Sequence, residues 1–428
     1  MLRCLRWTTL LAVAVLTACG GGGSTLSSGG GSTSSSSSSS GGNNFSAGGP
    51  NVVSMTVGPG PTAGSSTFNS PYVSVTVCIA GTSTCKIITD VLVDTGSVGL
   101  RLFASVISGL ALPNQVDTTG NGNVIAECLP FADGYTWGPV ASADVTVGGE
   151  KASAVPVNVI DDTSSFVAVP SSCTSGNGTS LNSVDNFGAN GVLGVGILQQ
   201  DCGPYCAQAA VQQTNTQGAT YYTCGNNTCA IYQELIGSQV TNPVALFPTD
   251  NNGVILQLPA IPATGASTAT GYLVFGIDTE SNNALGSATV LTIDPSSGTI
   301  ITLFNGQTLM GVLDSGSNGL FFADSAIPNC TGSTNAEEFF CPTSTLMLSA
   351  TNQGENGNSV LTPFQIANEN SLNGSFFALD DVGGSTATIT GLSDQFFDFG
   401  VPFFYGRTVF TGIEGTTAGS AAGPYYAY

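Results

Sequence analysis

The chain has 428 residues, of which only 8% are charged, and its 27 acidic residues face six lysines and arginines, for a formal net charge of −21. This acidic balance excludes nucleic acid and anionic membrane surfaces as expected partners of the folded part. The sequence contains no histidine, which excludes Ser-His-Asp and Cys-His catalysis and zinc sites built on imidazole. Carboxylates remain for acid and base chemistry, and we expect no cofactor and no metal.

Residues 1–19 have the features of an export signal. Two arginines precede a short apolar run, and small residues lead to Cys19. The run is too short to span a bilayer as a permanent helix. The segment resembles the bacterial lipoprotein signal, which implies lipidation of Cys19 and an exported protein, either anchored by this lipid at the cell envelope, in the outer membrane, or extracellular. A plain secretory signal cut after Ala18 is the alternative.

Residues 20–50 are nearly all glycine and serine, a composition that cannot bury a core, so we predict a disordered tether with a reach of roughly 30 Å. Beyond it, short alternating apolar runs bounded by turn residues predict an all-β fold with few short helices. The best helix candidate is 207–213. The predicted strands are 71–77, 144–147, 155–160, 254–258, 289–293, 299–303 and 386–390.

The cysteines predict disulfides. The chain has 12, and ten remain once Cys4 and Cys19 of the signal segment are set aside. In an oxidising compartment these form up to five disulfides. Spacing favours three local pairs: Cys78 with Cys85, Cys128 with Cys173, and Cys330 with Cys341. The pairing of four others stays open, with a metal site as the alternative: Cys202, Cys206, Cys224 and Cys229.

One pattern occurs twice. Residues 91–105 read VLVDTGSVGLRLFAS and residues 311–325 read GVLDSGSNGLFFADS. Asp94 and Asp314 thus end two apolar, strand-like runs at matched positions, where a carboxylate is costly unless it is hydrogen-bonded or used. The repeat indicates a duplicated chain with one shared site at a pseudo-twofold axis.

Two carboxylates held close share a proton, because both cannot ionise cheaply. The ionised one can take a proton from water while the protonated one polarises a carbonyl, which hydrolyses an amide without a covalent intermediate. The residues after each aspartate suit this chemistry: the glycines allow a tight turn, the hydroxyl residues before them can tie the two turns together, and the serines can bond the carboxylates. They are Thr95, Gly96, Ser97, Ser315, Gly316 and Ser317.

The doubled motif resembles the bilobal pepsin-like aspartic peptidases. Four further segments are similar to family segments in the family's order: 144–149 to the strand after the flap hairpin, 191–196 to the loop behind the first aspartate, 271–278 to the opening of the second lobe, and 399–410 to the last strands. The resemblance implies a bilobal β-barrel fold with catalytic Asp94 and Asp314. We expect a monomer with a polypeptide substrate or peptide ligand in the cleft between the lobes.

Two positions depart from the family's pattern. Arg101 stands where the family has a tryptophan seven residues after the first aspartate. Counting back along the hairpin places Phe131 at the position of the family's flap tyrosine, and Tyr135 or Trp137 could take that position if the hairpin register is shifted. We expect Arg101 and Arg407 to be surface arginines, with binding of acidic or C-terminal substrate groups as the alternative.

The expected function is a secreted aspartic endopeptidase, and the alternative is an inactive pepsin-fold envelope lipoprotein that binds a ligand. A glycosidase needs its two carboxyl groups about 5 Å apart or more. Two symmetric turns that meet at an axis bring their carboxyl groups closer than that. The stretch GVPFFYGRTVF at 400–410 also resembles a family of uncharacterised bacterial secreted proteins.

The chain is expected to divide into four parts after the signal and tether. They are an N-terminal β lobe (51–198) with Asp-Thr-Gly, a Cys-rich insertion between the lobes (199–240), a C-terminal β lobe (241–414) with Asp-Ser-Gly, and a flexible tail (415–428).

Overall fold

The computed structural model describes residues 49–62, 67–175, 177–209, 219–331, 339–386 and 393–428. The predicted signal, Cys19 and nearly all of the predicted tether lie outside these residues. Strands account for 44% of the described residues, which confirms the all-β class. The α-helices in the described part are single turns: α1 (Ser171–Thr174), α2 (Val184–Phe187) and α4 (Val401–Phe404). None of these described helices has the length and apolar character to cross a membrane.

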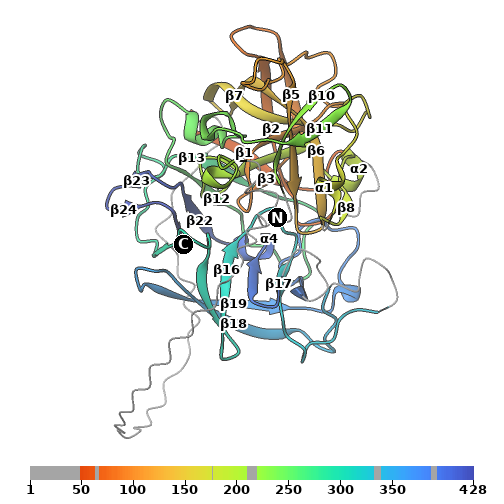
Figure 1. Cartoon of the computed structure of the whole chain (residues 1–428). Coiled ribbons are helices and arrows are strands. Elements are labelled where there is room, and N and C mark those ends of the chain that lie inside the picture. Colours follow the sequence, from red (N-terminus) through yellow and green to blue (C-terminus); the bar gives the residue numbers. More distant parts are fainter. Residues whose placement is uncertain (1–48, 63–66, 176, 210–218, 332–338, 387–392) are drawn as a thin grey trace, which may run out of the picture.

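The larger of two main sheets has 16 strands and runs through both halves of the molecule. In Figure 1 its strands β1, β13, β12 and β22 lie between the upper part of the molecule and the lower part. Its strands from the first half are β1 (Val52–Val57), β2 (Pro71–Ile79), β3 (Cys85–Asp94), β4 (Val98–Phe103), β5 (Val124–Pro130), β6 (Gly134–Val147), β7 (Glu150–Ile160), β8 (Thr179–Ser180), β9 (Gly191–Val195), β10 (Tyr221–Gly225) and β11 (Thr228–Ile231). Those from the second half are β12 (Gly253–Gln257), β13 (Ala269–Phe275), β14 (Val290–Thr292), β22 (Thr408–Gly412) and β25 (Tyr425–Ala427).

The second main sheet has seven strands, in the order β19-β18-β15-β16-β21-β17-β20, and forms the lower part of Figure 1. Its strands are β15 (Ile300–Phe304), β16 (Gln307–Leu313), β17 (Leu320–Phe322), β18 (Leu346–Gln353), β19 (Ser359–Ile366), β20 (Gly383–Gly384) and β21 (Phe396–Phe399). A small hairpin, β23 (Thr417–Ala418) with β24 (Ala421–Ala422), stands apart. The 3-10 turns are η1 (Gly203–Tyr205), η2 (Ile236–Ser238), η3 (Pro243–Leu246) and η4 (Glu369–Ser371).

Strands form at all the predicted positions that the structure describes in full, from 71–77 to 299–303. The remaining one, 386–390, lies outside the described residues except for Thr386, which is not in a strand. The predicted helix at 207–213 begins with a turn at Ala207, and its residues 210–213 lie outside the described part.

The same three-strand arrangement surrounds each aspartate motif. β9 lies between β3 and β4, parallel to β3 with Asp94 beside Gly194, and antiparallel to β4. β21 lies between β16 and β17, parallel to β16 with Leu313 beside Phe399, and antiparallel to β17. Both middle strands are almost wholly apolar because neighbouring strands and the core enclose them. The duplication seen in the sequence is therefore also a duplication of strand order.

The predicted insertion at 199–240 adds to the first half of the large sheet. Its strands β10 and β11 form a hairpin, and β10 pairs with β5 so that Tyr221 lies beside Glu127. The insertion thus widens the β5–β6 hairpin sheet.

The prediction of a flexible tail at 415–428 is wrong for its last residues. β25 pairs with both β22 and β14, and Tyr425, Tyr426 and Ala427 are buried. The physical reason is that two tyrosines and an alanine supply apolar area that the large sheet buries between two strands.

The described part of the chain contains five disulfides. The three predicted pairs are confirmed: Cys78–Cys85, Cys128–Cys173 and Cys330–Cys341. The open cluster resolves into Cys202–Cys206 and Cys224–Cys229. The alternative of a metal site in that cluster is wrong, because cysteines bonded to one another cannot supply thiolates.

Candidate functional site

The two aspartates of the repeated motif meet in the interior. Asp94 is the last residue of β3 and Asp314 follows β16; neither has exposed area. A hydrogen bond joins their side chains. A Cβ atom placed on Gly96 would lie 2.5 Å from Cγ of Asp314, so only glycine fits where the first turn approaches the second aspartate. The predicted shared site is therefore a carboxyl pair in hydrogen-bond contact.

Thr95 and Ser315 tie the two turns together, as the sequence predicts. The N–H of Thr95 donates to Oγ of Ser315 at 3.1 Å, and the N–H of Ser315 donates to Oγ1 of Thr95 at 2.9 Å. Each hydroxyl then donates at 2.8 Å to the opposite strand, Thr95 to the carbonyl of Leu313 and Ser315 to that of Val93. These four buried bonds fix the two turns, and hence the two aspartates, relative to one another.

Each aspartate accepts the same two local hydrogen bonds, one from the N–H of the glycine two residues later and one from the serine hydroxyl three residues later. The turns thus direct matching donors at both carboxyl groups, as expected from the sequence. The bonds are Gly96 N–H to Asp94 Oδ1 at 2.8 Å, Ser97 Oγ to Asp94 Oδ2 at 2.5 Å, Gly316 N–H to Asp314 Oδ1 at 2.8 Å, and Ser317 Oγ to Asp314 Oδ2 at 3.0 Å.

The two carboxyl groups differ in their titration. Burial, together with the charge of Asp314 and the hydrogen bond to it, raises the pKa of Asp94 to about 7. Burial raises the pKa of Asp314 as well, but its pKa lies below the usual value, and the hydrogen bonds from Asp94 and from the N–H of Gly316 are among the interactions that lower it. The pair therefore holds one proton on Asp94 and one charge on Asp314 in mildly acidic solution.

Two residues that the sequence reasoning missed lie beside the pair. Asp398 on β21 is buried, and its Oδ2 lies 2.6 Å from Oγ of Ser317. Tyr426 on β25 is also buried and is hydrogen-bonded to the backbone of Leu313; burial first, and then the nearby aspartates, raise the pKa of its hydroxyl. The signal for Asp398 was a single carboxylate inside the apolar run FFDFG; Tyr426 carries no comparable signal.

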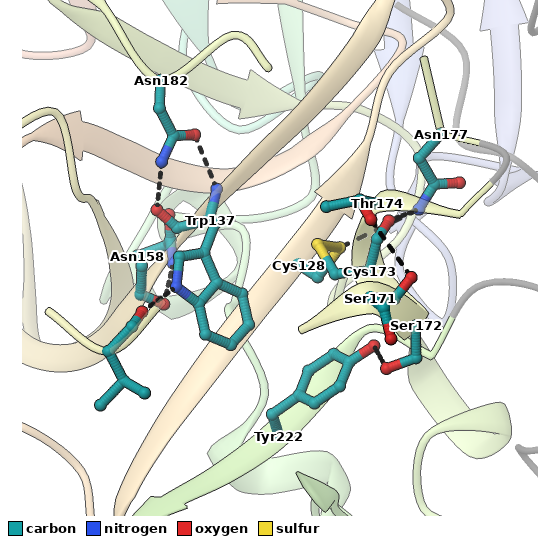
Figure 2. Close-up of a disulfide and its surroundings, with 12 residues drawn as sticks. Cys128, Trp137, Asn158, Ser171, Ser172, Cys173, Thr174, Asn177, Asn182 and Tyr222 are labelled. Atoms are coloured by element: carbon teal, nitrogen blue, oxygen red, sulfur yellow. Dashed lines mark hydrogen bonds between the residues drawn. A yellow bond between two sulfur atoms is a disulfide. The ribbon is translucent and has the colours of Figure 1, made fainter. Parts of the chain in front are cut away.

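The three flap candidates are buried in the first half of the molecule. Phe131 packs edge-on against Phe187, with ring centroids 5.6 Å apart. Tyr135 pairs with Pro130 across the hairpin. Figure 2 shows Trp137 beside the disulfide of Cys128, with Asn182 bonded to its backbone. The indole N–H of Trp137 donates to the carbonyl of Val167 at 2.9 Å, so this donor is already engaged away from the aspartates.

The expectation that Arg101 is a surface arginine is wrong. Its side chain is fully buried and bonded to Glu127 at 2.6 Å and to Asp201 at 2.8 Å. Tyr221 donates to Asp201 as well, at 2.8 Å. Two carboxylates and a carbonyl satisfy the guanidinium, which is why it is tolerated in the interior. Arg407, by contrast, is partly exposed and lies over the ring of Phe403.

One group of side chains in the described residues brings potential metal-ligating atoms together: Cys330, Cys341 and Glu369. The two cysteines form a disulfide, so the group offers a single carboxylate.

The structure thus defines a class: a disulfide-bonded β-sheet protein with a duplicated strand motif and a buried aspartate pair where the two copies meet. The chain belongs to the family described as "Protein of unknown function (DUF3443)", which matches residues 47–428. No curated protein matches it. The family's description gives no activity.

Proposed function

We propose that the chain is an aspartic endopeptidase of bilobal, pepsin-like fold, with Asp94 and Asp314 as its catalytic residues. The observation that carries the proposal is the hydrogen-bonded carboxyl pair, held by the reciprocal bonds of Thr95 and Ser315. The pair combines one raised and one lowered pKa, the condition under which one fold supplies an acid and a base together.

The proposed reaction needs only these two groups and water. Asp314 takes a proton from water as its oxygen attacks the peptide carbonyl carbon, and Asp94 gives its proton to the carbonyl oxygen. The resulting diol collapses: Asp314 passes its proton to the amide nitrogen, the C–N bond breaks, and a diol hydroxyl returns a proton to Asp94. The dyad ends in its starting state.

Export to a bacterial cell envelope, with a lipid on Cys19, completes the proposal. The five disulfides support an oxidising compartment. The 12-cysteine composition and the export features of residues 1–19 agree with it. Metabolic labelling with a fatty-acid analogue, compared between wild type and Cys19→Ser, tests the anchor.

The second candidate is a peptide-binding protein without turnover. It is favoured by one specific observation: Phe131, at the expected flap position, is buried against Phe187 and has no hydroxyl to donate to a substrate. A statyl-type peptide inhibitor that raises the melting temperature of a protein that hydrolyses nothing would decide for this candidate.

The test of the peptidase proposal is hydrolysis of a peptide library by the purified exported chain between pH 3 and 7. Asp94→Asn and Asp314→Asn are each expected to abolish cleavage. Asp185→Asn is the matched control, because Asp185 is an exposed aspartate on α2, and this variant should cleave like the wild type. Cleavage that survives either dyad substitution would rule the proposal out.

A further inference from the structure

The two halves differ at one position of the middle strand behind each aspartate. In the first half β9 sets Val192 beside Arg101, and in the second half β21 sets Asp398 beside Phe321. Val192 and Asp398 stand at the same place, two residues before Gly194 and Gly400. The duplication therefore supplies an internal comparison, in which only the Asp314 side has a third carboxyl group.

A count of protons follows from the contacts of Ser317. Its Oγ lies 3.0 Å from Oδ2 of Asp314 and 2.6 Å from Oδ2 of Asp398. A hydroxyl has one proton to donate, so one of the two carboxyl groups must donate to Ser317 while the other accepts from it. A second carboxyl proton lies in the hydrogen bond between Asp94 and Asp314. Three carboxyl groups thus hold two protons and one negative charge.

The Ser317 hydroxyl lies between the carboxyl groups of Asp314 and Asp398, and the surroundings of each carboxyl group decide which of the two is neutral. Asp314 already accepts the N–H of Gly316 and is bonded to Asp94. In the described part of the chain, Oδ1 of Asp398 is buried with no hydrogen-bond partner. The strand around Asp398 is aromatic, with Phe397 and Phe399 stacked 4.2 Å apart. A charge is costly in such a place, so the proton belongs on Asp398 and the charge on Asp314.

We propose that Asp398 is a positioning residue that makes Asp314 the ionised member of the pair, because it donates its proton to Ser317 and thereby directs the Ser317 hydroxyl at Asp314. The role of Asp398 in catalysis rests on the proposed peptidase function, whereas its protonation in the folded protein does not depend on that function. Burial, followed by the charge of Asp314, raises the pKa of Asp398 well above the usual value. The titratable groups facing it are Asp314, Asp94 and the hydroxyl of Tyr426.

If Asp398 lost its carboxyl proton, the hydrogen bonds of Ser317 would reverse. The Ser317 hydroxyl would then donate to Asp398 and no longer to Asp314, and Asp314 would lie near a second negative charge. The ionised state of Asp314 would become unfavourable, and with it the division of the pair into an acid and a base. Asp398→Asn keeps a hydrogen-bond donor towards Ser317 but cannot ionise. This variant therefore distinguishes the positioning of the Ser317 hydroxyl from the titration of Asp398.

The first experiment needs no activity. An unfolded aspartate titrates near pH 3.9, so between about pH 4 and the raised pKa of Asp398, the wild type should lose about tenfold in its folded-to-unfolded ratio per pH unit from this one group. Asp398→Asn should lose that part of the dependence in denaturant unfolding curves from pH 4 to 8. The exposed control Asp185→Asn should run parallel to the wild type. An Asp398→Asn curve that also runs parallel would overturn the proposal.

If Asp398→Asn does not fold, infrared spectroscopy of the wild type replaces it. The carbonyl band of a protonated carboxyl group should persist at neutral pH and shift in Ser317→Ala, since that hydroxyl is the partner of Asp398. A spectrum that Ser317→Ala leaves unchanged would overturn the proposal.

The second experiment applies to the active enzyme. Asp398→Asn should keep kcat/KM in acid and move the alkaline limb of the pH profile upward. A uniform fall at every pH would overturn the positioning role, since a purely structural defect has that effect. If the wild type cleaves nothing, the peptidase proposal fails by itself, and the unfolding curves still test Asp398.

Discussion

The N–H of Ser315 donates to Oγ1 of Thr95, and the N–H of Thr95 donates to Oγ of Ser315, across the two copies of the repeated motif. The two residues stand 220 positions apart in the chain. Each hydroxyl also donates to the opposite strand, so each of the two hydroxyls both accepts and donates a hydrogen bond. This network fixes the positions of the neighbouring aspartates relative to one another.

Thr95→Val should destabilise the fold by a few kcal/mol. The substitution keeps the shape but leaves the N–H of Ser315 and the carbonyl of Leu313 without partners, at about 1–3 kcal/mol for each buried group. Thr95→Ser is the control, because it retains the hydroxyl and loses one methyl group, which costs about 1 kcal/mol. Denaturant unfolding measures both. Equal losses in the two variants would show that the hydroxyl is not what holds the turns.

Asp94→Asn should flatten the pH dependence of stability between about pH 4 and 7. The pKa of Asp94 is raised to about 7 in the fold, mainly by burial. A carboxyl with a raised pKa contributes stability that is fully present below its unfolded pKa and is lost as the pH rises through its folded pKa. Unfolding curves at half-unit pH steps measure the effect.

Asp314→Asn is the opposite control for that experiment. Despite its burial, the pKa of Asp314 is lowered, so its contribution is present above the unfolded pKa and is lost as the pH falls through the folded pKa. Its removal should change the acid end of the curve. If both substitutions change the same end, the assignment of proton and charge within the pair is wrong.

Local patterns carried the correct predictions. The strands, the paired turns and the disulfides Cys78–Cys85 and Cys330–Cys341 depend on residues close together in the chain or on a motif that repeats. Arg101 was misjudged because its partners, Glu127 and Asp201, lie 26 and 100 positions away. Without those contacts an arginine is rightly expected at the surface.

The same limit applies behind the aspartates. Asp398 reaches the site because β21 lies between β16 and β17, and Tyr426 reaches it because β25 pairs with β22. Neither pairing is encoded in the few residues around it. A carboxylate within an aromatic run was the available sign that Asp398 has a specific partner.

Arg101→Met should destabilise the fold strongly, by about 3–5 kcal/mol, because Glu127 and Asp201 would remain buried without their cation. The loss should shrink in acid, where Glu127, whose pKa is raised mainly by burial, is protonated and no longer needs the guanidinium. Lys151→Met is the matched control: Lys151 is bonded to Asp144 at 2.9 Å but is 51% exposed, so its loss should be below about 1 kcal/mol. Similar losses in the two variants would mean that the buried cluster contributes no more than a surface pair.

The disulfides offer a last comparison, since they close loops of very different length. Cys128 and Cys173 are 45 positions apart, whereas Cys224 and Cys229 are five apart. If constraint of the unfolded chain is the main effect, replacing both cysteines by alanine should cost about 4 kcal/mol for the first pair and about 2 kcal/mol for the second. Because Cys128 lies beside Trp137 in the β5–β6 hairpin, the first double variant should also change the tryptophan fluorescence of the folded protein. Equal costs, with unchanged fluorescence in both variants, would contradict a role for the long disulfide in holding α1 against this hairpin.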